Sequence, residues 1–199
     1  MEIIMIRHFQ TKGNRQKRYI GVTDESLLSN ACLLPRIGEL QKQYPLVDQV
    51  VVSPLKRCRE TAALLFPGQK PVVCSHFREC DFGIFEGKNY EELKDHPDYL
   101  AWLESNGTIP FPGGEHPQRF IRRCRAGFEQ MVAEAVKERQ NRLAMVVHGG
   151  TIMAILSGYD SQKRGFYHWQ MENGGAFVIR IDEKKWLLEK TYFEEIRKI

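Results

Sequence analysis

Two histidines and two arginines stand near the points where short apolar strands are expected to end. Strands are predicted at 2–7 (EIIMIR), 49–52 (QVVV) and 143–148 (LAMVVH), because each is a short, apolar and largely β-branched run. The four side chains at or just beyond their carboxyl ends are Arg7, His8, Arg57 and His148. In open α/β sheets, ligands bind beyond the carboxyl ends of the strands, so we expect these four side chains to lie close together.

This set of side chains fits phosphoryl transfer without a metal. An imidazole can attack phosphorus and carry the phosphoryl group as a covalent intermediate. A guanidinium can bond two phosphate oxygens at once, and backbone N–H groups at the start of a helix, here expected after His148, add a further anion site. A histidine at a strand end is also commonly structural, so residue type and spacing alone leave both interpretations open.

Helical patterns alternate with these strands. Ser53-Pro54 directly after the second strand is a favourable helix start, and 117–140 carries apolar residues at the spacing of one helix face. The remaining candidates are a helix in 28–43 and strands at 71–75, 175–181 and 185–190. The last two are expected to be joined through Asp182-Glu183.

The alternation of helices with almost wholly apolar strands predicts an α/β fold. We expect a doubly wound, mostly parallel sheet with helices on both faces. Residues 85–115 interrupt the alternation with a stretch rich in Pro, Gly and Asn, which indicates a small inserted cap over one edge of the sheet. The predicted organisation is a single domain over 1–199 with the cap at 85–115.

Composition excludes several classes of protein. The 199 residues carry 29 basic and 25 acidic side chains, and a net charge of +4 is too balanced to favour nucleic acid as the main partner. Five cysteines at irregular spacings argue against a secreted disulfide framework. Neither a signal peptide nor a membrane span is expected, so the prediction is a cytoplasmic protein without a membrane partner. The oligomeric state is left open.

Five segments of the chain resemble the motifs of the histidine phosphatase superfamily, in its phosphoglycerate mutase-like branch. The segment RHFQTKGN at 7–14 resembles the family's Arg-His-Gly-Glu-Thr-x-x-Asn signature. The other four segments are SPLKRCRETA (53–62), RECDFGIFEG (78–87), PGGEHPQRF (112–120) and VVHGGTI (146–152). Each motif is weak by itself, but five in the family's order are specific, and together they span nearly the whole chain.

The resemblance implies a role for each matching residue. His8 would be the nucleophile that becomes phosphohistidine, and Glu79 would give a proton to the leaving oxygen and later activate water. The residues implied around the phosphoryl oxygens are Arg7, Arg57 and His148, with the backbone of Gly149 nearby and with Thr11 and Asn14 lining the phosphate pocket. The family needs no metal and no cofactor, and its fold agrees with the one predicted above. Glu86, in the same motif as Glu79, is expected to be structural.

The chain departs from the family pattern directly after the nucleophile. Phe9-Gln10 stands where Gly-Glu is usual, and we expect the bulky Phe9 to alter the wall of the substrate pocket. His116 also replaces the serine that usually follows Gly-Gly-Glu. The cap at 85–115 and Phe9 are therefore the expected determinants of substrate shape.

The resemblance favours a phosphomonoesterase that acts on a small phosphorylated metabolite. The sequence from Glu79 to Gly83 is closer to the family's phosphatases than to its mutases, and FEG at 85–87 is similar to bacterial phosphatases that include α-ribazole phosphatase. α-Ribazole 5'-phosphate is therefore a candidate substrate. The alternatives are phosphoryl transfer of the phosphoglycerate mutase type and a catalytically inactive module that binds a phospholigand.

Overall fold

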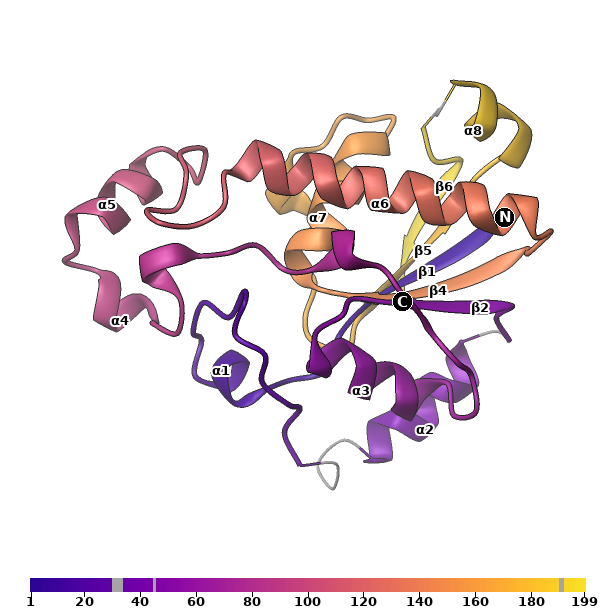
Figure 1. Ribbon diagram of the computed structural model, residues 1–199, viewed down its shortest axis with the longest axis horizontal. Helices are drawn as coiled ribbons and strands as arrows, with labels where there is room; N and C mark the ends of the chain where they lie inside the picture. Colours follow the sequence, from indigo (N-terminus) through magenta and orange to yellow (C-terminus); the bar gives the residue numbers. More distant parts are fainter. Residues whose placement is uncertain (30–33, 45, 190–191) are drawn as a thin grey trace.

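A six-stranded sheet forms the centre of the molecule (Figure 1). The computed structural model describes residues 1–29, 34–44, 46–189 and 192–199. The strands lie in the order β3-β2-β4-β1-β5-β6. Their bounds are β1 Glu2–Arg7, β2 Gln49–Val52, β3 Val72–Val73, β4 Arg142–Val147, β5 Ala176–Arg180 and β6 Glu195–Lys198. The strands predicted at 2–7, 49–52, 71–75, 143–148 and 175–181 are thus present, with small differences at their ends.

The register of the three central strands determines where the site residues lie. Strands β1, β4, β2 and β3 are parallel, whereas β5 and β6 pair antiparallel at one edge. Arg7 of β1 is the partner of Val147 of β4, and Val52 of β2 is the partner of Val146. Because all three strands end at the same level, the residues that follow them meet at one edge of the sheet.

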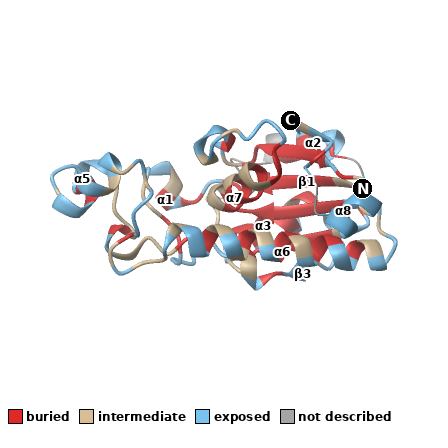
Figure 2. Cartoon of the chain, turned by 90° about the horizontal axis from the view of Figure 1, so that it is seen from above, coloured by how far each residue is buried: buried red, intermediate tan, exposed pale blue. Residues whose placement is uncertain are grey.

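Helices cover both faces of the sheet (Figures 1 and 2). Helices α6 (Pro117–Lys137) and α7 (Gly149–Tyr159) lie on one face, and α2 (Leu34–Gln43) and α3 (Lys56–Leu65) lie on the other. Successive strand residues point to opposite faces, so Ile3 and Met5 of β1 belong to the core under α6, and Ile4 and Ile6 belong to the core under α3. The predicted α/β fold with a mostly parallel sheet is confirmed.

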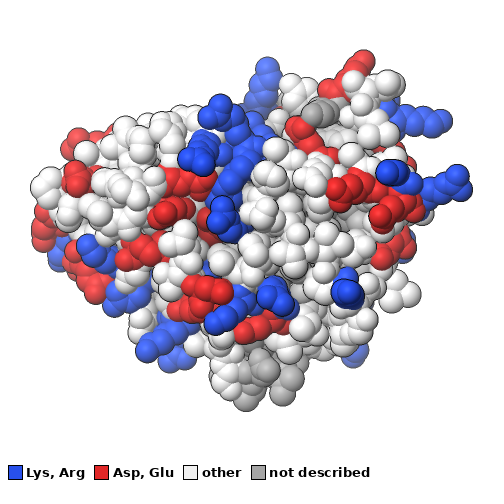
Figure 3. Space-filling view, in the orientation of Figure 1, with Lys and Arg blue, Asp and Glu red and all other residues white. Residues whose placement is uncertain are grey.

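The stripe predicted for the longest helix is buried in the structure. The five residues at helical spacing are Phe120, Cys124, Phe128, Met131 and Ala135. Pro117 opens α6, and the side chain of His116 accepts a hydrogen bond from the backbone N–H of Gln118 at 3.4 Å. Figure 3 shows both signs of charge interspersed on the face of the molecule that carries α6, with a short row of basic side chains over its first turns. Within the described part of the chain, no helix is long and apolar enough to cross a bilayer.

The prediction for the C-terminal segment 185–190 was wrong. Residues Glu183–Glu189 form helix α8, and β6, from Glu195 to Lys198, pairs with β5 instead. Oδ1 of Asp182 accepts hydrogen bonds from the backbone N–H groups of Lys184 and Lys185, at 3.0 and 3.1 Å, which starts a helix after β5. Residue 190 lies outside the described residues.

The segment expected to form a cap lies at one end of the molecule (Figure 1). It contains α4 (Tyr90–Leu93) and α5 (Pro97–Glu104), preceded by a 3-10 turn at Gly83–Phe85. Aromatic rings pack its interior, with Phe85 5.3 Å from Tyr99 and Trp102 5.3 Å from Phe111 between ring centroids. The division into one domain with a cap insertion at 85–115 stays a prediction.

Candidate active site

Two histidines meet at the carboxyl edge of the sheet. His8 follows β1, His148 follows β4, and their ring centroids are 5.1 Å apart. His8 is 3% exposed, and Arg57 and His148 are both 0% exposed. The structure therefore brings these three predicted residues together in an interior site.

A hydrogen bond to Nδ1 holds the His8 ring, and Nε2 has no hydrogen-bond partner among the described residues. Nδ1 lies 2.7 Å from the carbonyl oxygen of Phe9, and because a carbonyl only accepts, Nδ1 carries the hydrogen. In the neutral ring, Nε2 then has its lone pair free. Burial, followed by the positive charges of Arg57 and Arg7, lowers the pKa of His8 well below its ordinary value. His8 is therefore a neutral imidazole with a basic nitrogen available for attack.

Thr61 of α3 fixes the backbone beside His8. Its hydroxyl oxygen accepts a hydrogen bond from the Phe9 N–H at 3.0 Å, and the hydroxyl donates to the Arg57 carbonyl at 2.7 Å. The carbonyl of His8 accepts a further hydrogen bond from the side-chain amide of Asn173 at 3.0 Å. The backbone beside His8 is thus held by two segments that are distant in sequence.

Replacing Thr61 by valine is expected to lower the free energy of unfolding by about 1–3 kcal/mol, because the buried Phe9 N–H loses its acceptor. Denaturant unfolding measures the change. Thr151→Val is the matched control, because Thr151 is equally buried but its hydroxyl makes a long 3.5 Å bond to the Phe77 carbonyl and a weak contact with the Cys124 thiol. An equal loss in both variants would contradict the role assigned to Thr61.

The ring of His148 is fixed between Arg57 and Ser53. Nε of Arg57 donates to Nδ1 of His148 at 3.3 Å, so Nε2 carries the hydrogen and donates to the Ser53 hydroxyl at 2.7 Å. Sγ of Cys58 packs 3.5 Å from Nε2. Burial, then the charge of Arg57, lowers the pKa of His148 well below its ordinary value. His148 is neutral in this arrangement.

The remaining bonds of Arg57 hold the loop at residues 20–23. The guanidinium donates to the carbonyls of Thr23 at 2.7 Å and Gly21 at 2.8 Å, and makes a longer bond to Ile20 at 3.4 Å. The carboxylate of Glu86 holds the same loop by accepting from the N–H groups of Gly21 at 2.8 Å and Thr23 at 3.0 Å. These contacts agree with the structural role expected for Glu86. The second Nη1 hydrogen of Arg57 has no acceptor among the described residues.

Arg7 offers a donor that the protein does not use. Its Nη1 donates to the carbonyl of Met171. Its Nε–H is buried and has no hydrogen-bond partner among the described residues. Arg7 also lines the cavity described below. Because a buried N–H without an acceptor is costly, this group is well suited to bind an anion there.

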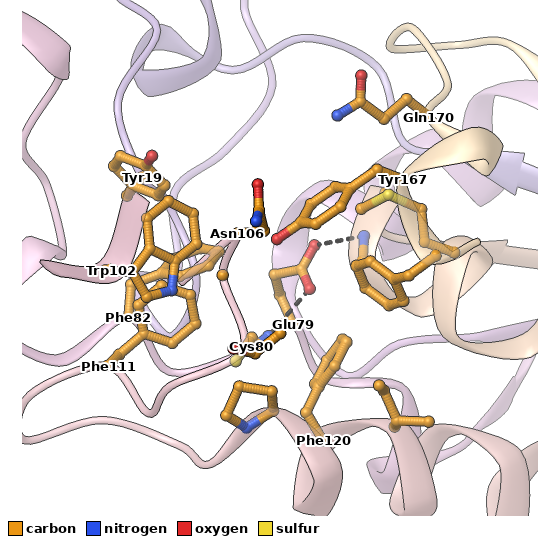
Figure 4. Close-up of a pocket in the computed structure, with 18 of the residues that line it drawn as sticks. Tyr19, Glu79, Cys80, Phe82, Trp102, Asn106, Phe111, Phe120, Tyr167 and Gln170 are labelled. Carbon is orange, nitrogen blue, oxygen red and sulfur yellow. Dashed lines mark hydrogen bonds between the residues drawn. The ribbon is translucent and has the colours of Figure 1, made fainter. Parts of the chain in front are cut away.

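Glu79 faces the same site from the loop after a 3-10 turn at Ser75–Phe77 (Figure 4). Its Oε1 accepts from the N–H of Cys80 at 2.9 Å, and its Oε2 accepts from the N–H of Gly150 at 3.2 Å. Burial raises the pKa of Glu79, while these bonds and the charges of Arg57 and Arg7 act in the opposite direction. A carboxyl group with a raised pKa, in the wall of the same cavity as Arg7, is suited to proton donation.

The family model of the histidine phosphatase superfamily, branch 1, matches residues 3–193. The chain belongs to this superfamily. This confirms the resemblance inferred from the five motifs, and makes the chain a phosphatase that hydrolyses phosphomonoesters.

Relatives of this phosphatase include enzymes with different names. A broad-specificity phosphatase of Saccharomyces cerevisiae is 32% identical over 164 residues, which cover 78% of this chain and 69% of the relative. Phosphoserine phosphatase 1 of Hydrogenobacter thermophilus is 28% identical over 195 residues, covering 93% and 89%. The crystal structure of the α-ribazole phosphatase from Shigella flexneri shares the fold, with a TM-score of 0.77, 22% identity and 92% of each chain covered.

A cavity of about 690 Å³ opens beside the phosphatase's Glu79 (Figure 4). Arg7, Glu79 and the start of α7 line one side. The aromatic side chains around the rest are Tyr19, Phe82, Trp102, Phe111, Phe120, Phe166 and Tyr167. Sequence reasoning placed substrate selection in the cap, but it missed Tyr19, Phe166 and Tyr167. The aromatic run at 166–169 (FYHW) was the signal that could have indicated part of this wall.

Glycines let the start of α7 approach the phosphatase's charged side chains. A Cβ on Gly150 would lie 2.5 Å from Oε1 of Glu79, and one on Gly149 would lie 3.4 Å from the Arg7 guanidinium. Gly149 thus lies where the resemblance places it, at the helix start and in the cavity wall. The Gly150 N–H at this helix start donates to the Glu79 carboxylate at 3.2 Å, and the start of a helix is in general favourable for binding an anion.

Three further residues of the predicted pocket have structural contacts. Thr11 is the N-cap of α1 (Lys12–Arg15), where its hydroxyl accepts from the Asn14 N–H at 3.2 Å and the Asn14 side chain accepts from the Thr11 N–H at 3.3 Å. Phe9 is 1% exposed and packs in the core under α3, so its ring is not among the residues that line the cavity. The expected effect of Phe9 on the cavity wall therefore needs correction: its carbonyl holds His8, and its ring fills the core.

Proposed function

We propose that the protein is a metal-independent phosphomonoesterase that works through a phosphohistidine on His8. The observation that carries this proposal is the His8 ring itself, which is buried, neutral and hydrogen-bonded through Nδ1 so that Nε2 is free. Arg7 and Arg57 supply positive charge around this nitrogen. Glu79 supplies a carboxyl group whose pKa is raised by burial.

In the first step, Nε2 of His8 attacks phosphorus and the bond to the leaving oxygen breaks. The leaving oxygen takes the proton of Glu79, which becomes a carboxylate. Arg7, Arg57 and the N–H of Gly149 stabilise the phosphoryl oxygens, and His148 joins them by turning its Nε2 hydrogen from Ser53 to the phosphoryl group. Thr11 and Asn14 are proposed to hold the backbone beside this group through their capping contacts. In the second step, the Glu79 carboxylate takes a proton from water, the water oxygen attacks phosphorus, and the bond to Nε2 breaks. Phosphate leaves, and His8 and the protonated Glu79 are regenerated.

The cavity favours an uncharged, flat leaving group. Among the described residues, Arg7 is the one Lys or Arg side chain in its wall, and the phosphoryl group would engage it. A leaving group with a carboxylate, as in phosphoserine or phosphoglycerate, would find no second cation there. An aromatic group would instead pack on rings such as Trp102 and Tyr167. α-Ribazole 5'-phosphate, which carries a benzimidazole ring, fits this chemistry and is the substrate we propose.

Three alternatives are distinguished by the same assay. Phosphoserine is supported by the name of the Hydrogenobacter thermophilus relative. Phosphoglycerate mutase-type transfer requires the phosphoryl group to return to a bound sugar acid instead of water. An inactive phospholigand-binding module would release no phosphate from any ester.

Phosphate release with EDTA present tests the proposal. The panel is α-ribazole 5'-phosphate, phosphoserine, p-nitrophenyl phosphate, and 3-phosphoglycerate with a bisphosphoglycerate primer. We expect the highest kcat/KM with α-ribazole 5'-phosphate. A higher value with phosphoserine would overturn the substrate assignment, and rapid formation of 2-phosphoglycerate would overturn hydrolysis. Activity that requires added metal would overturn the metal-free mechanism.

We expect kcat/KM to follow a bell-shaped pH profile. His8 must be neutral to attack phosphorus, and its pKa lies well below the ordinary pKa of an imidazole. The rate should therefore fall on the acidic side only when the pH drops below that ordinary pKa. Glu79 must carry its proton, and its pKa is raised above 4.5, so activity should fall as pH rises through that higher value. Initial rates across the pH range measure both limbs. An acidic limb at or above 6.5 would contradict the neutral His8.

A further inference from the structure

Every N–H of Arg123 on α6 has an acceptor oxygen. Nε and Nη2 donate to the two carboxylate oxygens of Glu115 at 2.8 and 2.7 Å, which is a bidentate pair. Nη1 donates to the carbonyls of His76 at 2.7 Å and Arg78 at 2.6 Å. The second Nη2 hydrogen is donated to the carbonyl of Glu79 at 3.0 Å. All five N–H hydrogens of Arg123 thus have acceptors. Three of these acceptors are backbone carbonyls of residues 76–79, the segment that carries Glu79.

Glu115 ties a second segment to the same loop. Its backbone N–H donates to the carbonyl of Asp81 at 2.9 Å. The glycine before it packs closely on the backbone, since a Cβ on Gly114 would lie 2.4 Å from the Asp81 carbonyl and 2.7 Å from the N–H of Gly83. The chain leaves the site after Asp81, runs through the predicted cap and returns at Gly114. The contacts of Glu115 and Arg123 therefore join the two ends of this excursion.

The pair is shielded from water and rests on a rigid element. The side chains of Arg123 and Glu115 are 15% and 12% exposed, so solvent competes little with their hydrogen bonds. Arg123 belongs to α6, a 21-residue helix with its apolar face in the core. The guanidinium therefore transmits the position of that helix to the backbone of Glu79.

We propose that Arg123 and Glu115 are positioning residues that hold Glu79 in place as the proton donor. The inference rests on the proposed function, in which Glu79 protonates the leaving oxygen. Neither side chain touches the reacting atoms; both act through the loop backbone. General acid catalysis needs the donor within hydrogen-bond reach of the leaving oxygen, so a small displacement of the loop lowers the rate of that step.

The dependence on the leaving group gives a specific readout. A poor leaving group such as the benzyl alcohol of benzyl phosphate needs a proton in the transition state, whereas p-nitrophenolate leaves well without one. Arg123→Gln is expected to lower kcat/KM, which reports formation of the phosphohistidine and not its hydrolysis, by about 10- to 100-fold for benzyl phosphate and by less than about threefold for p-nitrophenyl phosphate. Arg122→Gln is the matched control, because Arg122 is the exposed neighbour on the same helix and should change neither rate.

A double-mutant cycle with Glu79→Gln separates positioning from a general structural effect. If Arg123 acts through Glu79, Arg123→Gln should cost nothing further for benzyl phosphate once Glu79 is replaced. Multiplicative losses in the double variant, or equal losses with both substrates, would overturn the inference. If Arg123→Gln does not fold, Glu115→Gln and Arg123→Lys are measured instead. The same two comparisons apply: benzyl phosphate against p-nitrophenyl phosphate, and the cycle with Glu79→Gln.

The wild-type rates distinguish a failure of the positioning role from a failure of the proposed function. A wild-type enzyme that hydrolyses benzyl phosphate but gives multiplicative losses in the cycle refutes the positioning role alone. A wild-type enzyme that hydrolyses neither ester refutes the proposed function, and the positioning role with it.

Discussion

Replacement of His8 by alanine is expected to lower kcat/KM for every phosphate ester by about 10⁴-fold or more, because the variant has no nucleophile for phosphorus. The surrounding donors would remain, with Arg7 and the start of α7 still able to bind the phosphoryl group. Substrate binding should therefore be weakened much less than turnover. Initial rates of phosphate release, together with binding of inorganic phosphate by calorimetry, measure the two effects separately.

The covalent intermediate gives a second test of His8. Rapid acid-free quenching of wild-type enzyme during turnover should trap one phosphoryl group per chain, located on His8 by peptide mass spectrometry. His168→Ala is the matched control, because the His168 side chain is exposed and is not among the residues that line the cavity. It should keep both the intermediate and the rate. A phosphoryl group on another residue, or a His8→Ala rate within tenfold of wild type, would contradict the proposal.

Replacement of Glu79 by glutamine is expected to lower kcat for poor leaving groups by about 10²- to 10⁴-fold, because glutamine has no proton to give. The amide keeps the size of the side chain, and its one oxygen can accept from either the Gly150 N–H or the Cys80 N–H, so the fold should be retained with the loss of one hydrogen bond. For p-nitrophenyl phosphate the first step should change little, and hydrolysis of the phosphohistidine should become the slow step. A burst of p-nitrophenol followed by slow turnover is therefore expected in stopped-flow measurements.

The pH profile completes the test of Glu79. The alkaline limb of kcat/KM should disappear in Glu79→Gln, while the acidic limb assigned to His8 stays in place. Glu86→Gln is the matched control, because Glu86 holds the loop at Gly21 and does not line the cavity. Any loss in that variant should be equal for good and poor leaving groups and should leave both limbs present. An alkaline limb that persists in Glu79→Gln would assign the proton donor to another group.

Much of the fold could be predicted because local patterns and tertiary packing agree. The apolar runs of β1, β2 and β4 are buried strands, and the stripe from Phe120 to Ala135 is the buried face of α6. The region after Arg180 is different. Its residues WLL suit either a strand or a helix, and the choice depended on the Asp182 cap and on β6 taking the place beside β5. A strand pairing between distant segments has no local signal, so this element could not be predicted.

The chemistry of the site was predictable to a similar extent. His8 and His148 directly follow strands that pair in register, so their proximity follows from the sheet. The ring of Phe9 could not be placed in the same way, because it follows the end of the strand and its direction depends on the turn held by Thr61. The contact of Arg123 with the Glu79 loop also joins segments 44 residues apart, and no spacing rule relates them.

The sequence by itself determined the family, the position of His8 at the end of β1 and the order of the five motifs, because these features are fixed by short segments and by strand alternation. The tertiary structure alone decided which nitrogen of His8 is free, how burial shifts the pKa values of His8 and Glu79, and which side chains surround the leaving group. Tyr19, Trp102 and Tyr167 come from three distant segments. Their meeting in one cavity depends on the path of the chain, which no local pattern records.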